Sequence, residues 1–289
     1  MRGAKRLLGT SFTVVVAGTA AVLGTACPVA AKDLPLWEAG VGAAAIATPD
    51  YRGADEYSAY VVPLPYLTYR GDRLKVTRDR VRGLIFNTDR IELDVSASLT
   101  VPVRASRNAT RRGMDNLDPV WELGPSLKLT LLASPSKSHE LALRLPVRAA
   151  VASNLSRVNG AGFTFTPNLG MDWRDLSLMG ASGWNTSVYG TLLFATRQYH
   201  DYIYTVDQRF VTPARAAYQA PGGYAGYHLT ASMGRRWKSF WAGGFIRYDS
   251  VAGAAFEDSP LVKRRGGVQA GFAISWVFAE SSTRVEATE

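Results

Sequence analysis

The chain has 289 residues, of which 33 are Lys or Arg and 24 are Asp or Glu, so its formal charge is +9. Hydrophobic residues make up 47% of the chain, too many for a disordered protein, while a mean hydropathy of −0.04 is too low for a bundle of membrane helices. The single Cys excludes a disulfide framework and any site built from several thiolates.

The first 31 residues have the features of a cleaved signal peptide. Basic residues at positions 2, 5 and 6 precede a mostly small and apolar run over 7–23, and Val29-Ala30-Ala31 supplies small residues for cleavage. We therefore expect residues 1–31 to be a signal peptide and the mature chain to begin at Lys32. Removing the three basic residues, with no acid beside them, reduces the charge from +9 to +6.

Two other interpretations of the leader stay open. An uncleaved membrane anchor is disfavoured because the apolar run over 12–26 is shorter than the roughly 20 residues of a spanning helix. Lipidation at Cys27 is disfavoured because Gly24 stands three places before it, where lipoproteins carry a large aliphatic residue.

After the leader, hydrophobic residues recur with a period of two. From Ile91 to Val103 every second residue is apolar, and the residues between them are mostly polar. This alternation is typical of a strand with one apolar and one polar face. The same alternation occurs over 121–131, 141–151, 163–173 and 268–278.

The length of these runs separates membrane strands from soluble ones. Strands of soluble proteins usually have about 5–6 residues, whereas a tilted strand that crosses a membrane needs about 9–11. We therefore expect an all-β fold, a transmembrane antiparallel up-and-down β-barrel with apolar side chains toward lipid and polar side chains inside. A soluble secreted β-sandwich or lipocalin-like barrel with shorter strands is the alternative.

The predicted loops indicate orientation and strand count. Short links at 87–89, 134–138, 176–183 and 237–238 alternate with longer links at 104–118, 153–162, 198–223 and 251–264. Outer-membrane barrels combine short periplasmic turns with long outer loops, so we expect both termini in the periplasm. Residues 73–87 fit one strand or a hairpin turning at 79–80. The hairpin gives twelve strands, with ten as the fallback, in a barrel over 32–278 followed by a polar, flexible periplasmic tail over 279–289.

Five segments carry a family resemblance. They are Pro49-Asp50-Tyr51-Arg52-Gly53, Pro63-Leu64-Pro65-Tyr66-Leu67-Thr68-Tyr69-Arg70, Leu123-Gly124-Pro125, Tyr218-Gln219-Ala220-Pro221-Gly222-Gly223-Tyr224 and Asp258-Ser259-Pro260-Leu261-Val262. In this order they resemble the MltA-interacting protein family, MipA/OmpV, over residues 37–278. The resemblance implies an outer-membrane barrel, with family members linked to scaffolding of murein synthases and lytic transglycosylases, and others to adhesion or envelope stress. It implies no catalytic residues. The chain departs from the usual outer-membrane signal, a terminal aromatic residue, because residues 279–289 follow Phe278.

Support for catalysis is weak. His139, His200 and His228 are the only histidines. His200-Asp201 with Ser259 suggests a Ser/His/Asp set like that of outer-membrane lipid hydrolases, but the chain lacks a G-x-S-x-G elbow. The histidine spacing does not suit a metal, and no Gly-rich phosphate motif opens a helix. We expect no enzyme activity, no metal and no cofactor.

Basic residues in two predicted outer loops are the remaining candidate site. They are Arg104, Arg107, Arg111, Arg112, Lys263, Arg264 and Arg265. Because Arg binds phosphate well, we expect contact with lipopolysaccharide, and a merely solvated basic loop is the alternative. Nucleic acid is implausible for an exported chain. Charges of both signs on inward positions predict a small barrel closed by its own ion pairs rather than a wide pore. These are Glu92, Asp94, Glu122, Arg144, Arg148 and Arg174.

Together these features predict a non-enzymatic scaffold or interaction protein in the outer membrane of a Gram-negative cell envelope. Its expected contacts are outer-membrane lipid and lipopolysaccharide, with murein hydrolases or synthases as protein partners. A narrow small-solute channel and an adhesin-like surface protein are the alternatives. A soluble secreted β protein and an outer-membrane lipid hydrolase are less favoured.

Overall fold

The computed structural model describes residues 32–71, 74–76, 81–83, 85–136, 138–154, 156–178 and 180–287. It is an antiparallel all-β structure with one short α-helix. The expected signal peptide over 1–31, with Cys27, lies outside the described residues. No helix in the described part of the chain is long and apolar enough to cross a membrane.

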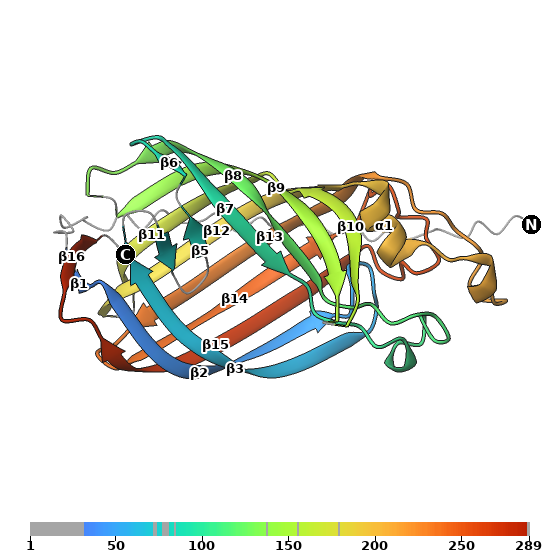
Figure 1. Cartoon of the computed structure of the whole chain (residues 1–289), viewed down its shortest axis with the longest axis horizontal. Helices are drawn as coiled ribbons and strands as arrows, with labels where there is room; N and C mark the ends of the chain where they lie inside the picture. The colour runs from blue at the N-terminus through green and yellow to red at the C-terminus, as the bar shows by residue number, and fades with distance from the viewer. Residues whose placement is uncertain are drawn as a thin grey trace, which may run out of the picture.

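Fourteen strands form one curved sheet whose long strands run side by side (Figure 1). They are β2 (Trp37–Pro49), β3 (Tyr57–Arg70), β4 (Leu74–Val76), β5 (Val81–Gly83), β6 (Phe86–Asn87), β7 (Ile91–Leu99), β8 (Val120–Ala133), β9 (His139–Ser153), β10 (Val158–Phe165), β11 (Asn168–Leu178), β12 (Ala181–Ala195), β13 (Gly223–Arg236), β14 (Phe240–Ser250) and β15 (Gly266–Glu280). Their hydrogen-bonded order is β5-β4-β3-β2-β15-β14-β13-β12-β10-β9-β8-β7-β6, and β11 pairs with β12 and β9.

The last long strand pairs with the first one. β15 runs antiparallel to β2 from the pair Ala270–Ala47 to the pair Glu280–Glu38. This confirms the expected pairing between the two ends of the predicted barrel. The pairing satisfies the backbone groups of both strands, which would otherwise be sheet edges.

Residues 279–287, which belong to the segment expected to be a polar, flexible tail, take part in strand pairing. β15 continues to Glu280, and β16 (Arg284–Ala287) pairs with β1 (Lys32–Pro35) in a separate two-stranded sheet. Arg284 also forms an ion pair with Glu280 at 3.0 Å. Backbone pairing with the start of the expected mature chain holds this segment, and such a long-range partner is not visible in local composition.

Two expected strands are interrupted or shortened. The strand expected over 163–175 is divided into β10 and β11 at Thr166-Pro167, because proline has no N–H for the ladder. The strand expected over 90–103 ends at Leu99, and Val103 makes an isolated bridge to Leu117 instead. The hairpin expected within 73–87 is present as β4 paired with β5, and its turn over 77–80 lies outside the described residues.

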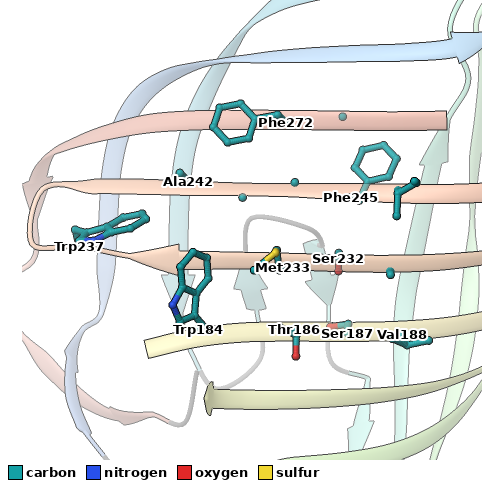
Figure 2. Close-up of a pocket in the computed structure, with 15 residues that line it drawn as sticks. Trp184, Thr186, Ser187, Val188, Ser232, Met233, Trp237, Ala242, Phe245 and Phe272 are labelled. Atoms are coloured by element: carbon teal, nitrogen blue, oxygen red, sulfur yellow. The ribbon is translucent and has the colours of Figure 1, made fainter. Parts of the chain in front are cut away.

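Alternation along the strands gives the sheet an apolar outer face and a polar inner face. On β15, Phe272 and Ile274 are 56% and 47% exposed, whereas Gln269 and Ser275 on the opposite face are buried. A shallow hollow of about 700 Å³ interrupts the outer face over β12, β13, β14 and β15 (Figure 2). Trp184 and Trp237 stand at one end of this hollow (Figure 2).

The two ends of the sheet differ in structure. Helix α1 (Arg197–Tyr204) and the short 3-10 helices η1 (Ala105–Arg107) and η2 (Gln208–Phe210) lie in long loops at one end. β1 and β16 lie at the opposite end, beside short turns (Figure 1). The long loop expected over 198–223 is therefore partly helical.

Candidate functional site

The long loops at one end pack into a cap with its own apolar core, here called the outer-loop cap. Its buried residues come from four loops and adjoining strand ends: Tyr51, Ala54, Val103, Leu117, Tyr204, Val206, Ala220, Ala225, Val251, Ala254, Phe256 and Leu261. The rings of Tyr204 and Phe256 stack at 3.6 Å between centroids. Tyr51 donates a hydrogen bond to the Leu261 carbonyl at 2.8 Å. Contacts between loops far apart in sequence therefore hold the cap together.

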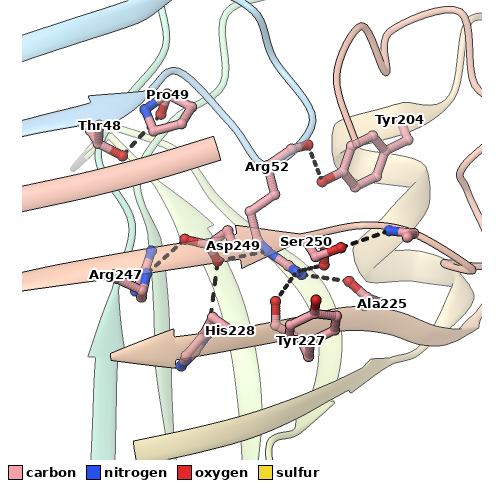
Figure 3. Close-up of polar contacts among 11 residues, drawn as sticks. Thr48, Pro49, Arg52, Tyr204, Ala225, Tyr227, His228, Arg247, Asp249 and Ser250 are labelled. Carbon is pink, nitrogen blue, oxygen red and sulfur yellow. Dashed lines mark hydrogen bonds and ion pairs between the residues drawn. The ribbon is translucent and has the colours of Figure 1, made fainter. Parts of the chain in front are cut away.

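Arg52 joins the outer-loop cap to the sheet (Figure 3). Its guanidinium forms an ion pair with Asp249 at 3.1 Å and donates hydrogen bonds to the carbonyls of Ala225 at 2.6 Å and Ser250 at 2.9 Å. The Tyr204 hydroxyl donates to the Arg52 carbonyl at 2.9 Å. The Arg52 side chain thus connects the loop after β2 with β13 and β14, and its backbone carbonyl connects this loop with helix α1.

Two further polar groups lie beside Asp249. Arg247 donates to its carboxylate at 2.8 Å, and Nδ1 of His228 lies 3.8 Å from it. The close approach of Arg52 requires Gly226, which has φ of +93°. A Cβ on Gly226 would lie 2.9 Å from Nη2 of Arg52 and 2.0 Å from the nearest carbonyl oxygen, so a larger residue would displace the guanidinium.

Helix α1 connects the outer-loop cap to the interior ion pairs. Its tyrosines pack against a small buried cluster of Val120, Ala150, Ala152 and Ala161 on β8, β9 and β10. Tyr199 donates a hydrogen bond to Glu122 at 3.0 Å, and Glu122 also lies 3.7 Å from Arg148 and accepts from Thr164 at 2.9 Å. Burial raises the pKa of the Tyr199 hydroxyl, so it stays a protonated donor.

A cavity of about 460 Å³ lies inside the sheet, beneath the outer-loop cap. Its wall carries charges of both signs, among them Glu122, Arg148 and Asp249. Among the described residues, Oε1 of Gln269 and Nε2 of His200 are buried on this wall without a hydrogen-bond partner. A polar cavity of this size suits water or a small polar solute.

Ion pairs lie on the inner face between the cavity and the short-turn end. Lys128 lies 2.7 Å from Glu140 and 3.8 Å from Glu92, and Arg174 lies 3.7 Å from Glu140. These side chains are at most 23% exposed. Alternating anions and cations therefore line one wall of the interior from β7 to β11.

A second group of ion pairs lies on other strands of the interior. Arg144 lies 3.2 Å from Asp172, and Glu38 lies 3.1 Å from both Arg70 and Arg236. Five of the six inward charges named from the sequence form ion pairs: Glu92, Glu122, Arg144, Arg148 and Arg174. Asp94, the sixth, is buried.

The basic residues expected to contact lipopolysaccharide do not all lie on the surface. Arg104, Arg107, Arg112, Lys263, Arg264 and Arg265 are exposed. Arg111 is 3% exposed, donates to the Ile203 carbonyl at 2.7 Å and lies 5.7 Å from the centre of the Tyr51 ring. It therefore stabilises the outer-loop cap and is not placed for external phosphate.

The residues considered for hydrolysis have separate partners. Ser259 donates to the Tyr204 carbonyl at 2.7 Å, and Nδ1 of His200 lies 2.7 Å from the Pro221 carbonyl. Asp201 accepts from Thr205 at 2.7 Å. The described structure contains no hydrogen bond among Ser259, His200 and Asp201, and no group of three His, Cys, Asp or Glu that could hold a metal.

Sequence reasoning did not single out the Arg52–Asp249 contact. The sequence does contain a signal for Asp249. Arg247 and Asp249 occupy alternate inward positions in a strand that is otherwise mostly apolar or small. Arg52 lies in the first of the five resembling segments. Nothing local to either segment indicates that the two meet.

An apolar outer face, a charged interior and long strands in one antiparallel sheet are together the pattern of outer-membrane β proteins. The family model described as MltA-interacting protein MipA matches residues 41–278. The chain therefore belongs to this family, and the resemblance found in the sequence is confirmed.

Two other comparisons concern solved structures and curated proteins. A solved structure described as a bacterial polysaccharide outer membrane secretin matches with a TM-score of 0.38 and 8% identity, covering 84% of this chain and 99% of that chain. The search of curated proteins found no match.

Proposed function

We propose that this protein is a non-enzymatic outer-membrane interaction protein that binds MltA, the murein-processing enzyme named in its family description. The observation that carries the proposal is the family match over 41–278, which includes most of the described sheet. In this proposal residues 1–31 are removed on export, and the short turns with β1 and β16 face the periplasm, where a murein enzyme is located.

The sheet pairing supports a twelve-stranded barrel. β10 and β11 keep one register against β9, with Phe165 opposite Val147 and Asn168 opposite Arg144, so they act as one interrupted strand. β5 pairs with β4, and two residues later Ile85 donates to the Leu93 carbonyl at 2.9 Å, beside β6 and β7. β5 and β6 therefore act as a second interrupted strand, which lies between β4 and β7. Counting β10 with β11 as one strand, and β5 with β6 as another, reduces the fourteen strands to twelve. A closed ring removes the sheet edges that lipid cannot satisfy.

The capped and charged interior supports a scaffold over a channel. The outer-loop cap covers one end, and ion pairs such as Lys128–Glu140 line the wall beyond the cavity. A narrow small-solute channel stays the second candidate because of the cavity of about 460 Å³. Single-channel recording in planar bilayers separates the two, since a scaffold gives no steady conductance.

The six exposed basic loop residues support contact with lipopolysaccharide as a further part of the proposal. They lie on loops at the end that the proposed orientation places outside the cell. Replacing Lys263, Arg264 and Arg265 together with Gln is expected to weaken lipopolysaccharide binding, whereas replacing the buried Arg111 is expected to loosen the outer-loop cap. Equal lipopolysaccharide binding by the triple variant would reject this part.

The decisive test is a pull-down of purified MltA on the full mature protein immobilised in detergent. We expect MltA to be retained above the background of an unrelated outer-membrane barrel immobilised at the same density. N-terminal sequencing of the exported protein is expected to begin at Lys32, and its mass is expected to match the unmodified chain from Lys32 onward, without Cys27. Background-level retention of MltA at micromolar concentration would reject the proposed partner.

A further inference from the structure

The hollow on the outer face of β12–β15 has a floor of small residues. Ala231, Ala242 and Gly244 occupy outward positions on β13 and β14. Larger apolar side chains surround them, each 44–56% exposed: Val188, Met233, Ile246 and Phe272. The hollow of about 700 Å³ therefore forms an apolar groove, here called the outer groove, within the range of about 300–1,000 Å³ usual for small-ligand sites.

A cation, Arg235, lies at the end of the outer groove where Trp184 and Trp237 stand. The Arg235 guanidinium is 5.7 Å from the centre of the Trp184 ring and 5.2 Å from that of Trp237. Arg235 points outward, because Arg236, the next residue along the strand, points inward to Glu38. Both indoles thus hold the guanidinium at the rim of the outer groove by cation–π contact.

Arg235 forms no ion pair within the described part of the chain. In the same part of the chain, the indole nitrogen of Trp184 has no hydrogen-bond acceptor. The buried indole nitrogen is not exposed to a ligand, so the Arg235 guanidinium is the group suited to the oxygen atoms of a phosphate.

The position of this cluster along the strands identifies the ligand class. Trp184 lies near the start of β12, and Trp237 lies in the turn between β13 and β14, at the end that also carries β1 and β16. Tryptophan and arginine are typical of the depth where a membrane meets water. In the proposed orientation this is the periplasmic leaflet, which is built from phospholipid, while lipopolysaccharide occupies the opposite leaflet.

We propose that the outer groove binds one glycerophospholipid of the periplasmic leaflet, with an acyl chain over Ala231 and Gly244 and its phosphodiester on Arg235. The inference rests on the proposed membrane location and adds a specific lipid site to it. The apolar floor takes the hydrocarbon, and the cation fixes the headgroup.

The headgroup contact is tested by native mass spectrometry of the full mature protein in detergent micelles. The probes are phosphatidylglycerol and a diacylglycerol with the same acyl chains but no phosphate. We expect the protein to retain phosphatidylglycerol about tenfold more than diacylglycerol, equivalent to one charge-assisted contact of about 1.4 kcal/mol. Arg235→Gln is expected to remove this preference. Lys238→Gln, which changes an exposed cation at the same end, is expected to preserve it.

The acyl-chain contact is tested by filling the groove. Ala231→Phe is expected to reduce retention of both lipids severalfold. Ala270→Phe, at an exposed outward position on β15 outside the groove lining, is expected to leave retention unchanged. Heat-dependent gel mobility checks that each variant is folded. If Ala231→Phe does not fold, the comparison of lipid retention between Arg235→Gln and Lys238→Gln tests the site.

Four results would overturn the lipid site: equal retention of the two lipids, equal effects of Arg235→Gln and Lys238→Gln, preferential retention of lipopolysaccharide, or a protein dimer in place of the lipid complex. Membrane fractionation and the MltA pull-down test the proposed function independently of the lipid site. A protein that is in the outer membrane and binds MltA, but shows one of these results, lacks the lipid site only. Absence from the outer membrane would reject the proposed location itself.

Discussion

Replacing Arg52 with Ala is expected to loosen the outer-loop cap while leaving the sheet assembled. The substitution removes an ion pair to a carboxylate that is 8% exposed and two hydrogen bonds to backbone carbonyls. Breaking a buried ion pair costs about 3–5 kcal/mol. Asp249 keeps Arg247 at 2.8 Å and lines a polar cavity, so the lower end of that range, about 3 kcal/mol, applies.

Hydrogen exchange measures this loss directly, because amides of the cap exchange through local opening. A destabilisation of about 3 kcal/mol corresponds to roughly 100-fold faster exchange, since each 1.4 kcal/mol is tenfold. We expect this acceleration in peptides over 251–261, which hold Phe256 and Leu261 of the cap core, and little change in β8 and β9. Arg264→Ala removes an exposed arginine of the same loop region and serves as the control. Exchange within threefold of wild type in Arg52→Ala would refute the assigned role of Arg52.

Three further predictions address lipid exposure, topology and pH. Leu229 is 53% exposed at a mid-strand position of β13, and Leu229→Arg is expected to lower the free energy of unfolding in a bilayer by about 2–4 kcal/mol. Leu229→Phe is expected to lower it much less, so equal unfolding midpoints for the two variants would contradict the outward assignment. On intact cells trypsin is expected to cut after the exposed Arg209, and a Cys replacing Ser136 is expected to be labelled by an impermeant reagent only after permeabilisation; the opposite pattern would reverse the orientation. Burial lowers the pKa of His200 below its usual 6.5, so the unfolded cap binds the proton more readily. The stability of the cap is therefore complete above pH 6.5 and falls as the pH drops below it, and His200→Gln is expected to flatten this dependence in exchange measurements at pH 8 and pH 5.5.

Local alternation was sufficient to predict the strands and their two faces. Phe272 and Ile274 are exposed and Ser275 is buried because side chains on a strand point alternately to opposite sides. This period of two can be recognised from adjacent residues of the sequence. The charged interior followed from the same rule, since Glu122 and Arg148 occupy inward positions. The family resemblance was readable because it depends on short segments in a fixed order.

Contacts between distant segments decided the features that the sequence did not reveal. Arg111 looks like its exposed neighbours in composition, but it is buried because the loop after β7 folds against helix α1. The polar residues of β16 pair with β1, and the Arg52–Asp249 contact joins positions 197 residues apart. The floor of the outer groove exists only because small residues on β13 and β14 are neighbours across the sheet. Strand pairing and loop packing depend on which segments meet in space, so tertiary structure alone determined the cap and both hollows.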